Sequence, residues 1–265
     1  MIERTGRTIL QENPMPASSA SLAQQLSDAD KAGKRLTSAA LTEPATPTEA
    51  FAVQRETLAL NNWLTGGYKV AIRPDGSSVS APMAHITHVS GSGTAGFERP
   101  AVDALEVEIC FVLGKDLPLA GDTPYTRETL LDHVAGIYSG IEFLGHRLDD
   151  GSKSPALLFL ADRLGNAGYV RGQELPAKLI EPGQSYPLTI TVNGDTVFEG
   201  PGKHPNDDPV AAFLLFANTL TETVAKGRII TTGSLCGAIP TPPRAAIAIS
   251  GFTTLAVTAI STREV

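Results

Sequence analysis

The stretch Leu-Glu-Val-Glu-Ile-Cys-Phe-Val-Leu-Gly at residues 105–114 decides how the fold is interpreted, because it sets two carboxylates inside an apolar run. Side chains of a β-strand alternate between its two faces, so Glu106, Glu108 and Cys110 share one face and apolar residues line the other. At roughly 3.3 Å per residue, the two glutamates lie about 6–7 Å apart, close enough to converge on one small cation. The pattern therefore predicts a strand with one acidic face.

A third carboxylate stands in a second apolar run. Glu142 lies in Tyr-Ser-Gly-Ile-Glu-Phe-Leu-Gly at residues 138–145, where an unpaired carboxylate would be costly or would stay protonated. If this run is a strand near the first, Glu106, Glu108 and Glu142 form the all-oxygen ligand set that Mg²⁺ or Mn²⁺ prefers over zinc or copper. Glu-x-Glu on the solvated face of an antiparallel strand also occurs without a metal, so the pattern alone leaves both interpretations open.

The composition excludes some classes of function. The 265 residues carry 21 basic and 28 acidic side chains, a net charge of −7, so no basic stripe is available for a phosphate backbone and nucleic acid is not an expected partner. A hydrophobic content of 42% is enough for one large domain or a main domain with a small appendage. Cys110 and Cys236 lie in apolar runs rather than at disulfide spacing, which favours a reducing compartment and a cytoplasmic location.

No segment has the pattern of a signal peptide or a membrane helix. Residues 1–7 lack the apolar stretch of a secretory signal. The longest uncharged segment, residues 245–261, is interrupted by Ser250 and Gly251, and we interpret it as two strands around a turn. We expect neither export nor insertion into a membrane.

The N-terminal quarter of the chain is predicted to be helical. One helix is well marked at its start, because Thr46 is a candidate N-cap, Pro47 fits the first helical position and Glu49 follows three residues after the cap. A Gly-Gly pair ends it. We assign residues 1–65 to a helical N-terminal part and residues 66–265 to a β-roll catalytic domain.

Beyond Tyr68 the sequence changes to short β-branched runs separated by Gly, Pro and Asp. These runs do not alternate regularly with helices, so a doubly wound nucleotide-binding fold is disfavoured. One amphipathic helix, begun by Asp208 and Pro209, is predicted to extend to Thr223. The expected strands are residues 68–72, 105–113, 136–144, 168–170, 187–192, 228–232, 245–249 and 255–261.

The two acidic runs resemble the 2-keto-4-pentenoate hydratase branch of the fumarylacetoacetate hydrolase superfamily. The resemblance follows the chain in order over nearly its whole length. Its motifs are Glu-Ala-Phe-Ala-Val-Gln at 49–54, Gly-Tyr-Lys at 67–69, Glu-Val-Glu-Ile-Cys-Phe-Val-Leu-Gly-Lys-Asp-Leu-Pro at 106–118, Ile-Glu-Phe-Leu-Gly-His-Arg at 141–147, Ala161-Asp162 through Tyr169-Val170, Phe-Ala-Asn at 216–218 and Ile-Thr-Thr-Gly-Ser-Leu at 230–235.

The resemblance implies an α+β fold, a mixed, largely antiparallel β-roll like the C-terminal domain of fumarylacetoacetase, with a small helical N-terminal part. It also implies that Glu106, Glu108 and Glu142 hold Mg²⁺ or Mn²⁺, and that the chain forms a homo-oligomer. The implied activity is that of a metal-dependent lyase on a small 2-oxo or 2-hydroxydienoic acid, first of all a 2-oxopent-4-enoate-type hydratase of aromatic catabolism. A decarboxylase or hydratase of the same pathway is a further implied partner.

The resemblance also assigns roles around the metal. Lys69 and Asp162 are the implied catalytic residues, with Lys69 either pairing with the substrate carboxylate or transferring a proton. Gly233 and Ser234 form a backbone and hydroxyl cradle for that carboxylate. Arg163 stands where the family has asparagine, and this departure adds a guanidinium that can fork onto a carboxylate.

The chain departs from the family's pattern at several places, and two of them bear most directly on the reaction. Met83, in Ala-Pro-Met, stands where the hydratases have an acidic residue that follows a proline. The segment 162–165 is Asp-Arg-Leu-Gly where the family has Asp-Asn-Ala-Ser. Alternatives to hydration therefore include a 2-oxo acid decarboxylase, a carbon–carbon bond hydrolase of the same superfamily, and an oxo-acid-binding companion subunit that has lost its proton-transfer residues.

Overall fold

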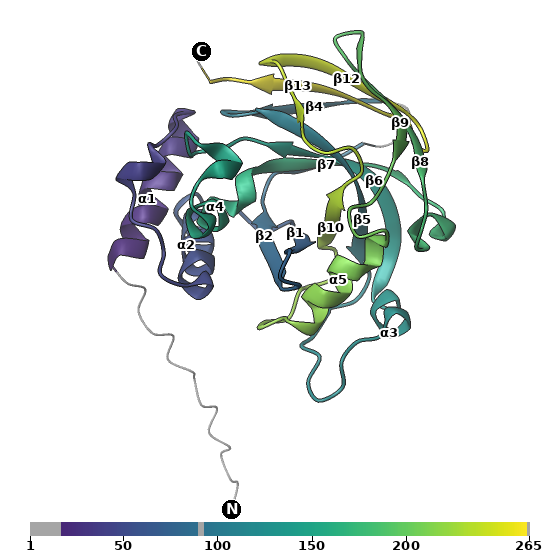
Figure 1. Ribbon diagram of the computed structural model, residues 1–265, viewed down its shortest axis with the longest axis horizontal. Coiled ribbons are helices and arrows are strands. Elements are labelled where there is room, and N and C mark those ends of the chain that lie inside the picture. The colour runs from purple at the N-terminus through teal and green to yellow at the C-terminus, as the bar shows by residue number, and fades with distance from the viewer. Residues whose placement is uncertain (1–16, 90–92, 264–265) are drawn as a thin grey trace, which may run out of the picture.

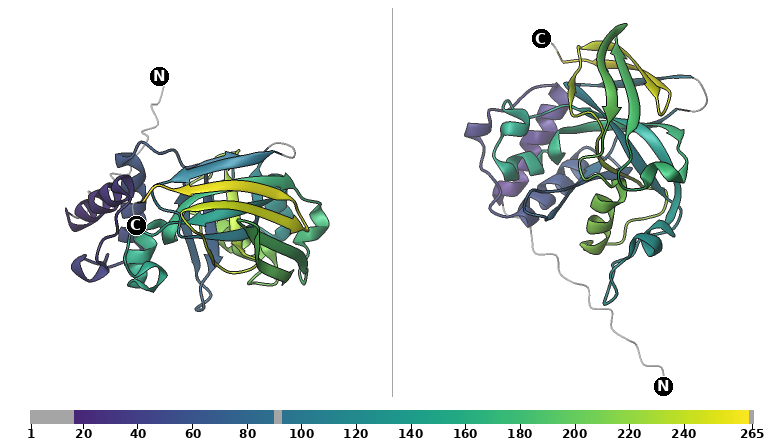
Figure 2. Two further views of the ribbon diagram at one scale, coloured as in Figure 1. Left: turned by 90° about the horizontal axis from the view of Figure 1, so that it is seen from above. Right: turned by 45° about the vertical axis from the view of Figure 1, so that its right-hand side comes forward.

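The computed structural model describes residues 17–89 and 93–263 and confirms the expected α+β fold, in which curled mixed sheets follow N-terminal helices (Figures 1 and 2). The α-helices of these residues are α1 (Ala17–Ala32), α2 (Pro47–Leu60), α3 (Arg127–Leu131), α4 (Ala156–Ala161) and α5 (Pro209–Asn218). The strands are β1 (Gly67–Ile72), β2 (Ser78–Met83), β3 (Ile86–His88), β4 (Thr94–Arg99), β5 (Ala104–Leu113), β6 (Val134–Leu144), β7 (Asn166–Glu174), β8 (Tyr186–Val192), β9 (Asp195–Gly202), β10 (Ile229–Ser234), β11 (Ile239–Pro240), β12 (Arg244–Gly251) and β13 (Leu255–Ser261).

The strands form two sheets. One has the order β2-β1-β10-β5-β6-β7-β3, with β11 paired to β5, and the other has the order β4-β13-β12-β8-β9. The pairs β1–β10, β3–β7 and β4–β13 are parallel and the remaining pairs are antiparallel. Figure 1 shows β12 and β13 at the top of the molecule, α1, α2 and α4 together on one side, and α5 beneath.

Local sequence explains where the two best-predicted helices begin. The Thr46 side chain accepts a hydrogen bond from the backbone N–H of Glu49 at 3.2 Å, and Pro47 follows at the first helical position of α2. Asp208 caps α5 in the same way by accepting from the Val210 N–H at 2.8 Å. The helix α5 ends at Asn218 rather than at Thr223, so the sequence-based prediction was too long.

The side chains of residues 105–113 alternate between the two faces of β5 as predicted, so one face lies in the core and the other carries the glutamates. The apolar face of β5, including Val107, Ile109 and Phe111, is fully buried in the main core, which both sheets share. A smaller core lies around α1, α2 and α4, and Val79 of β2 contributes to it. The N-terminal helices therefore pack on elements from beyond residue 65. Among the described residues, no helix is both long enough and apolar enough to span a bilayer.

Candidate metal centre

Three carboxylates meet where β5 and β6 pair. Glu106 lies directly opposite Glu142 in the antiparallel register, and Glu108 follows two residues along β5 on the same face. One oxygen from each of the three side chains lies within 4.8 Å of the other two. Glu108 and Glu142 are buried, whereas Glu106 is half-buried. The structure thus brings together the three glutamates that the sequence singled out.

Donors from three further strands fix two of these carboxylates. Lys69 on β1 donates from Nζ to Glu142 Oε1 at 2.6 Å, and Asn166 at the start of β7 donates from Nδ2 to the same oxygen at 2.9 Å. Thr231 on β10 donates from its hydroxyl to Glu108 Oε2. Each buried glutamate therefore has one oxygen held by the protein.

Burial first, and the crowding of negative charge second, shift the pKa values of the site. Burial raises the pKa of Glu108 well above its ordinary value, and Glu142 and Glu106 raise it further. Burial likewise raises the pKa of Glu106, although Lys69 opposes the shift. Burial by itself would lower the pKa of Lys69, but the three glutamates outweigh it and the pKa is raised, so Lys69 stays an ammonium ion.

The donor set fits a hard divalent cation. Three carboxylates face one ammonium group, which leaves a formal charge of −2 when all are ionised, and a divalent cation would offset it. Glu142 Oε2 is buried and has no hydrogen-bond partner among the described residues. Cys110 shares this face, but its sulfur is not among the ligand atoms that converge, and burial raises the pKa of its thiol to about 12. The oxygens that remain suit Mg²⁺, Mn²⁺ or Ca²⁺.

Gly233 and Ser234 lie at the end of β10, where Ser234 is opposite Glu108 in the register. The Ser234 hydroxyl donates to the Gly237 carbonyl at 3.0 Å, so it is engaged within its own turn. Gly233 has a φ of 131°, and a Cβ on it would lie 2.8 Å from Pro205, so the close approach requires glycine. Ser234 thus lies beside Glu108 in the sheet, while the role of both residues as a cradle for a substrate carboxylate stays a prediction.

Asp162 and Arg163 lie in a separate buried cluster. The Asp162 carboxylate accepts from Arg147 Nε at 2.5 Å, and its side chain is fully buried. The Arg163 guanidinium lies 3.6 Å from Asp30 and over the ring of Trp63, 5.1 Å from the ring centroid. Burial, with the neighbouring Arg147, lowers the pKa of Arg163 to about 9. These contacts face the N-terminal helices and not the three glutamates.

Met83 is fully buried at the end of β2, in a cluster with Cys110, Tyr169 and Ile229. The residue that the resemblance places at the acidic position of the hydratases is therefore apolar and buried, and it lies on the Cys110 side of the sheet. Neither Asn166 nor a role for Thr231 was predicted from the sequence. Both are polar residues within apolar strand-forming runs, and that was the available signal.

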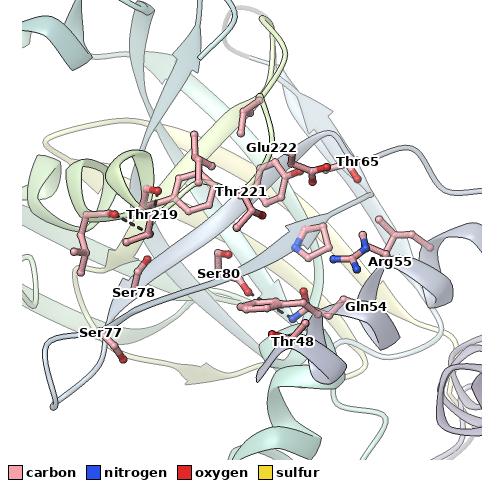
Figure 3. A pocket seen from close by; sticks show the side chains of 18 of the residues that line it. Thr48, Gln54, Arg55, Thr65, Ser77, Ser78, Ser80, Thr219, Thr221 and Glu222 are labelled. Carbon is pink, nitrogen blue, oxygen red and sulfur yellow. Dashed lines mark hydrogen bonds between the residues drawn. The ribbon is translucent and has the colours of Figure 1, made fainter. Parts of the chain in front are cut away.

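A cavity of about 930 Å³ lies on the other face of the β1–β2 hairpin (Figure 3). It is bounded by α2, the hairpin and the end of α5, and its wall includes Trp63, Tyr68 and Phe216. Because side chains alternate along β1, Tyr68 lines the cavity while the next residue, Lys69, reaches Glu142. None of the three glutamates lines this cavity.

Comparison with solved structures identifies the fold. The 4-oxalocrotonate decarboxylase from Pseudomonas putida G7, solved with magnesium and adipate, superposes with a TM-score of 0.73 at 14% identity, over 94% of this chain and 100% of that one. A fumarylacetoacetate hydrolase family protein from Yersinia pestis CO92 has a TM-score of 0.53 at 15% identity, over 75% and 94%. This chain has the fumarylacetoacetate hydrolase fold.

A third structure of this fold, fumarylpyruvate hydrolase from Pseudomonas aeruginosa with Mn²⁺ and pyruvate, has a TM-score of 0.54 at 13% identity, over 73% of this chain and 88% of that one. No protein-family model matches the sequence, and no curated protein matches it either. The fold predicted from the resemblance is thereby confirmed, while the hydratase branch within the fumarylacetoacetate hydrolase superfamily stays a prediction.

Proposed function

We propose that this protein is a divalent-metal-dependent lyase acting on a small 2-oxo acid, with Glu106, Glu108 and Glu142 as metal ligands. The observation that carries the proposal is the excess of buried negative charge, together with the unpartnered oxygen of Glu142. Structures of the same fold were solved with a divalent metal and a carboxylic acid, namely magnesium with adipate, calcium with acetate and Mn²⁺ with pyruvate, which supports the assignment.

A bound Mg²⁺ or Mn²⁺ would supply a Lewis acid that polarises the 2-oxo group and stabilises the negative charge that develops on it. Lys69, whose raised pKa keeps it protonated, is the proposed catalytic residue beside it. Its ammonium group pairs with a substrate carboxylate or delivers a proton. The turn at Gly233 and Ser234 borders the site and is the proposed cradle for the substrate carboxylate.

Within this class we propose decarboxylation as the favoured activity and hydration as the second candidate. Hydration requires a group that activates water and a proton delivered to a distant carbon, and buried Met83 stands where the hydratases have an acid. Decarboxylation requires fewer catalytic groups from the protein, because no water has to be activated. The bond to the departing carboxylate breaks, its electron pair moves through the conjugated chain to the 2-oxo group, and one proton from a donor such as Lys69 then completes the product.

Two further observations bear on the choice between decarboxylation and hydration. The match to the decarboxylase structure covers 94% of this chain, whereas the match to the fumarylpyruvate hydrolase covers 73%. This coverage supports decarboxylation. Hydration is retained as the second candidate because Gly-Tyr-Lys at 67–69 and Glu-Val-Glu at 106–108 are the motifs that resemble the hydratase branch.

The proposal is tested by incubating the protein and its Glu108→Gln variant with Mg²⁺ or Mn²⁺ and each of two substrates, 4-oxalocrotonate and 2-hydroxypenta-2,4-dienoate. Ultraviolet absorbance follows loss of the conjugated system, and CO₂ is measured separately. Metal-dependent CO₂ release from the first substrate, absent in the variant, supports a decarboxylase. Loss of the dienol to a hydroxylated product without CO₂ supports the hydratase. Tight, metal-dependent oxalate binding without turnover of either acid overturns the enzyme assignment in favour of a companion subunit.

A further inference from the structure

Three consecutive residues in the link between α4 and β7 have a left-handed backbone. The φ angles are 54° at Arg163, 53° at Leu164 and 72° at Gly165. Glycine adopts this region readily, whereas arginine and leucine do so at a steric cost. Two adjacent residues with side chains persist in this conformation only where the surroundings over-determine it, and such strain gathers at functional sites.

Arg147 holds this turn at both ends. Its Nη2 donates to the carbonyl of Asp162 at 2.6 Å and its Nη1 donates to the carbonyl of Asn166 at 3.0 Å. Its Nε donates to the Asp162 carboxylate, and the whole side chain is buried. A guanidinium presents its donors in one rigid plane, so a single side chain can clamp the two ends of a five-residue turn.

The clamp is attached to the N-terminal helices. Asp30 on α1 accepts from Arg147 Nη1 at 3.3 Å and from Arg99 on β4 at 2.6 Å. Figure 1 shows α4, which leads into the turn, beside α1 and α2. The helical part is therefore joined by buried charged hydrogen bonds to the segment that reaches the glutamates.

The turn brings two polar groups to the carboxylates. Asn166 donates to Glu142 Oε1, and the carbonyl of Leu164 lies 3.5 Å from Lys69 Nζ, the other donor to that oxygen. Both donors hold Oε1, and the second oxygen of Glu142 has no partner among the described residues. The arrangement selects which oxygen of Glu142 is left for a cation.

We propose that the Arg147-clamped turn, residues 162–166, is the positioning element of the metal centre. Asn166 orients Glu142, and Asp162 orients Arg147, so Asp162 is a positioning residue rather than a group that touches substrate. The inference rests on the proposed metal site and deepens it. Groups that orient metal ligands are typically worth about 10–100-fold in metal affinity.

The first test titrates Mn²⁺ into the full-length protein and follows free Mn²⁺ by electron paramagnetic resonance, without substrate. Asn166→Ala is expected to weaken Mn²⁺ binding by about 10–100-fold. Asn218→Ala is the matched control, because Asn218 makes two hydrogen bonds to the Tyr125 backbone at the end of α5, away from the carboxylates. It should bind Mn²⁺ as the wild type does. Urea unfolding in EDTA confirms that each variant is folded. Wild-type affinity in folded Asn166→Ala would overturn the proposal.

The second test asks whether Arg147 acts through Asn166. Arg147→Lys keeps the charge facing Asp30 and Asp162 but cannot span both ends of the turn. It should weaken Mn²⁺ binding, and the double variant Arg147→Lys, Asn166→Ala should be no weaker than the more affected single variant. Losses that multiply would show independent actions and would overturn the clamp.

The two proposals fail in different ways. If Glu108→Gln binds Mn²⁺ as tightly as the wild type, the metal site and the proposed function fail together. If Glu108→Gln loses Mn²⁺ while Asn166→Ala retains it, the positioning role alone fails.

Discussion

Replacing Glu108 with glutamine is expected to stabilise the metal-free protein and to remove its response to metal. The side chain is 2% exposed, and its ligand oxygen lies within 4.8 Å of oxygens of Glu106 and Glu142. Two unit charges at that 4.8 Å limit repel by about 3.5 kcal/mol at an effective dielectric constant of about 20. The substitution relieves two such repulsions and loses one attraction to Lys69. Burial and the neighbouring carboxylates shift Glu108 toward its protonated form, which reduces this relief, so the expected net gain in free energy of unfolding is about 1–3 kcal/mol.

The pKa of Glu108 determines how the stability difference between the variant and the wild type changes with pH. Burial and the neighbouring Glu142 and Glu106 raise the folded-state pKa of Glu108 well above the unfolded value of 4.5. The folded protein then binds more protons than the unfolded chain, so its stability falls as the pH rises from about 4.5 through the raised value. Glutamine has no such titration and keeps an oxygen that can accept from Thr231. The advantage of the variant should therefore be larger at pH 8 than at pH 5.

The assay is urea unfolding at pH 8, once in EDTA and once in Mg²⁺ at about a hundred times its dissociation constant. The wild type should gain about 2.7 kcal/mol from the metal, and Glu108→Gln should gain much less. Glu199→Gln, on the exposed side of β9, is the control and should match the wild type in both buffers. A variant that is less stable than the wild type in EDTA, or that keeps the full gain in Mg²⁺, would refute the reasoning.

Three further predictions concern single residues. Lys69→Met removes the ammonium that pairs with Glu142 at 2.6 Å, so we expect turnover to fall by at least about 100-fold and the free energy of unfolding to fall by about 3–5 kcal/mol, measured by CO₂ release and urea unfolding. Burial lowers the pKa of His204 to about 4. The free energy of unfolding should therefore fall by about 2 kcal/mol as the pH falls from 7 to 4.5, because the unfolded chain binds the proton more readily. His204→Gln should lack this part of the fall when urea unfolding is compared at the two pH values. Met83→Asp places a carboxyl in a fully buried apolar cluster and should lower the free energy of unfolding by about 3 kcal/mol, whereas an unchanged urea midpoint would show that the position is open to water.

Individual strands and the three glutamates were predictable because their signals are local, whereas the fold as a whole was predicted from the family resemblance. Alternation in residues 105–113 predicted both faces of β5, and Thr46 predicted the start of α2. The edge strand β2 was missed because Ser-Val-Ser-Ala-Pro-Met carries a proline and two serines, which are typical of turns. Its pairing with β1, and not its own residues, makes it a strand.

The contacts around the carboxylates were not predictable, because they join residues far apart in sequence. Lys69 lies 73 positions before Glu142, and Thr231 lies 123 positions after Glu108. Asp162 illustrates the same difficulty, since only the fold shows that its carboxylate is engaged by Arg147. The residue types indicated that these side chains are functional, but only the strand pairing determines which atoms they contact.

The alternation of Tyr68 and Lys69 along β1 limits how this chain can change during evolution. The hairpin of β1 and β2 separates the cavity beside α2 and α5 from the carboxylate cluster, and adjacent residues of β1 face opposite sides of the hairpin. Inserting one residue within either strand would exchange the two sets of side chains and turn the lysine away from the carboxylates. Length changes are therefore tolerated in the turn at residues 73–77, whereas within the strands they can be accommodated only two residues at a time.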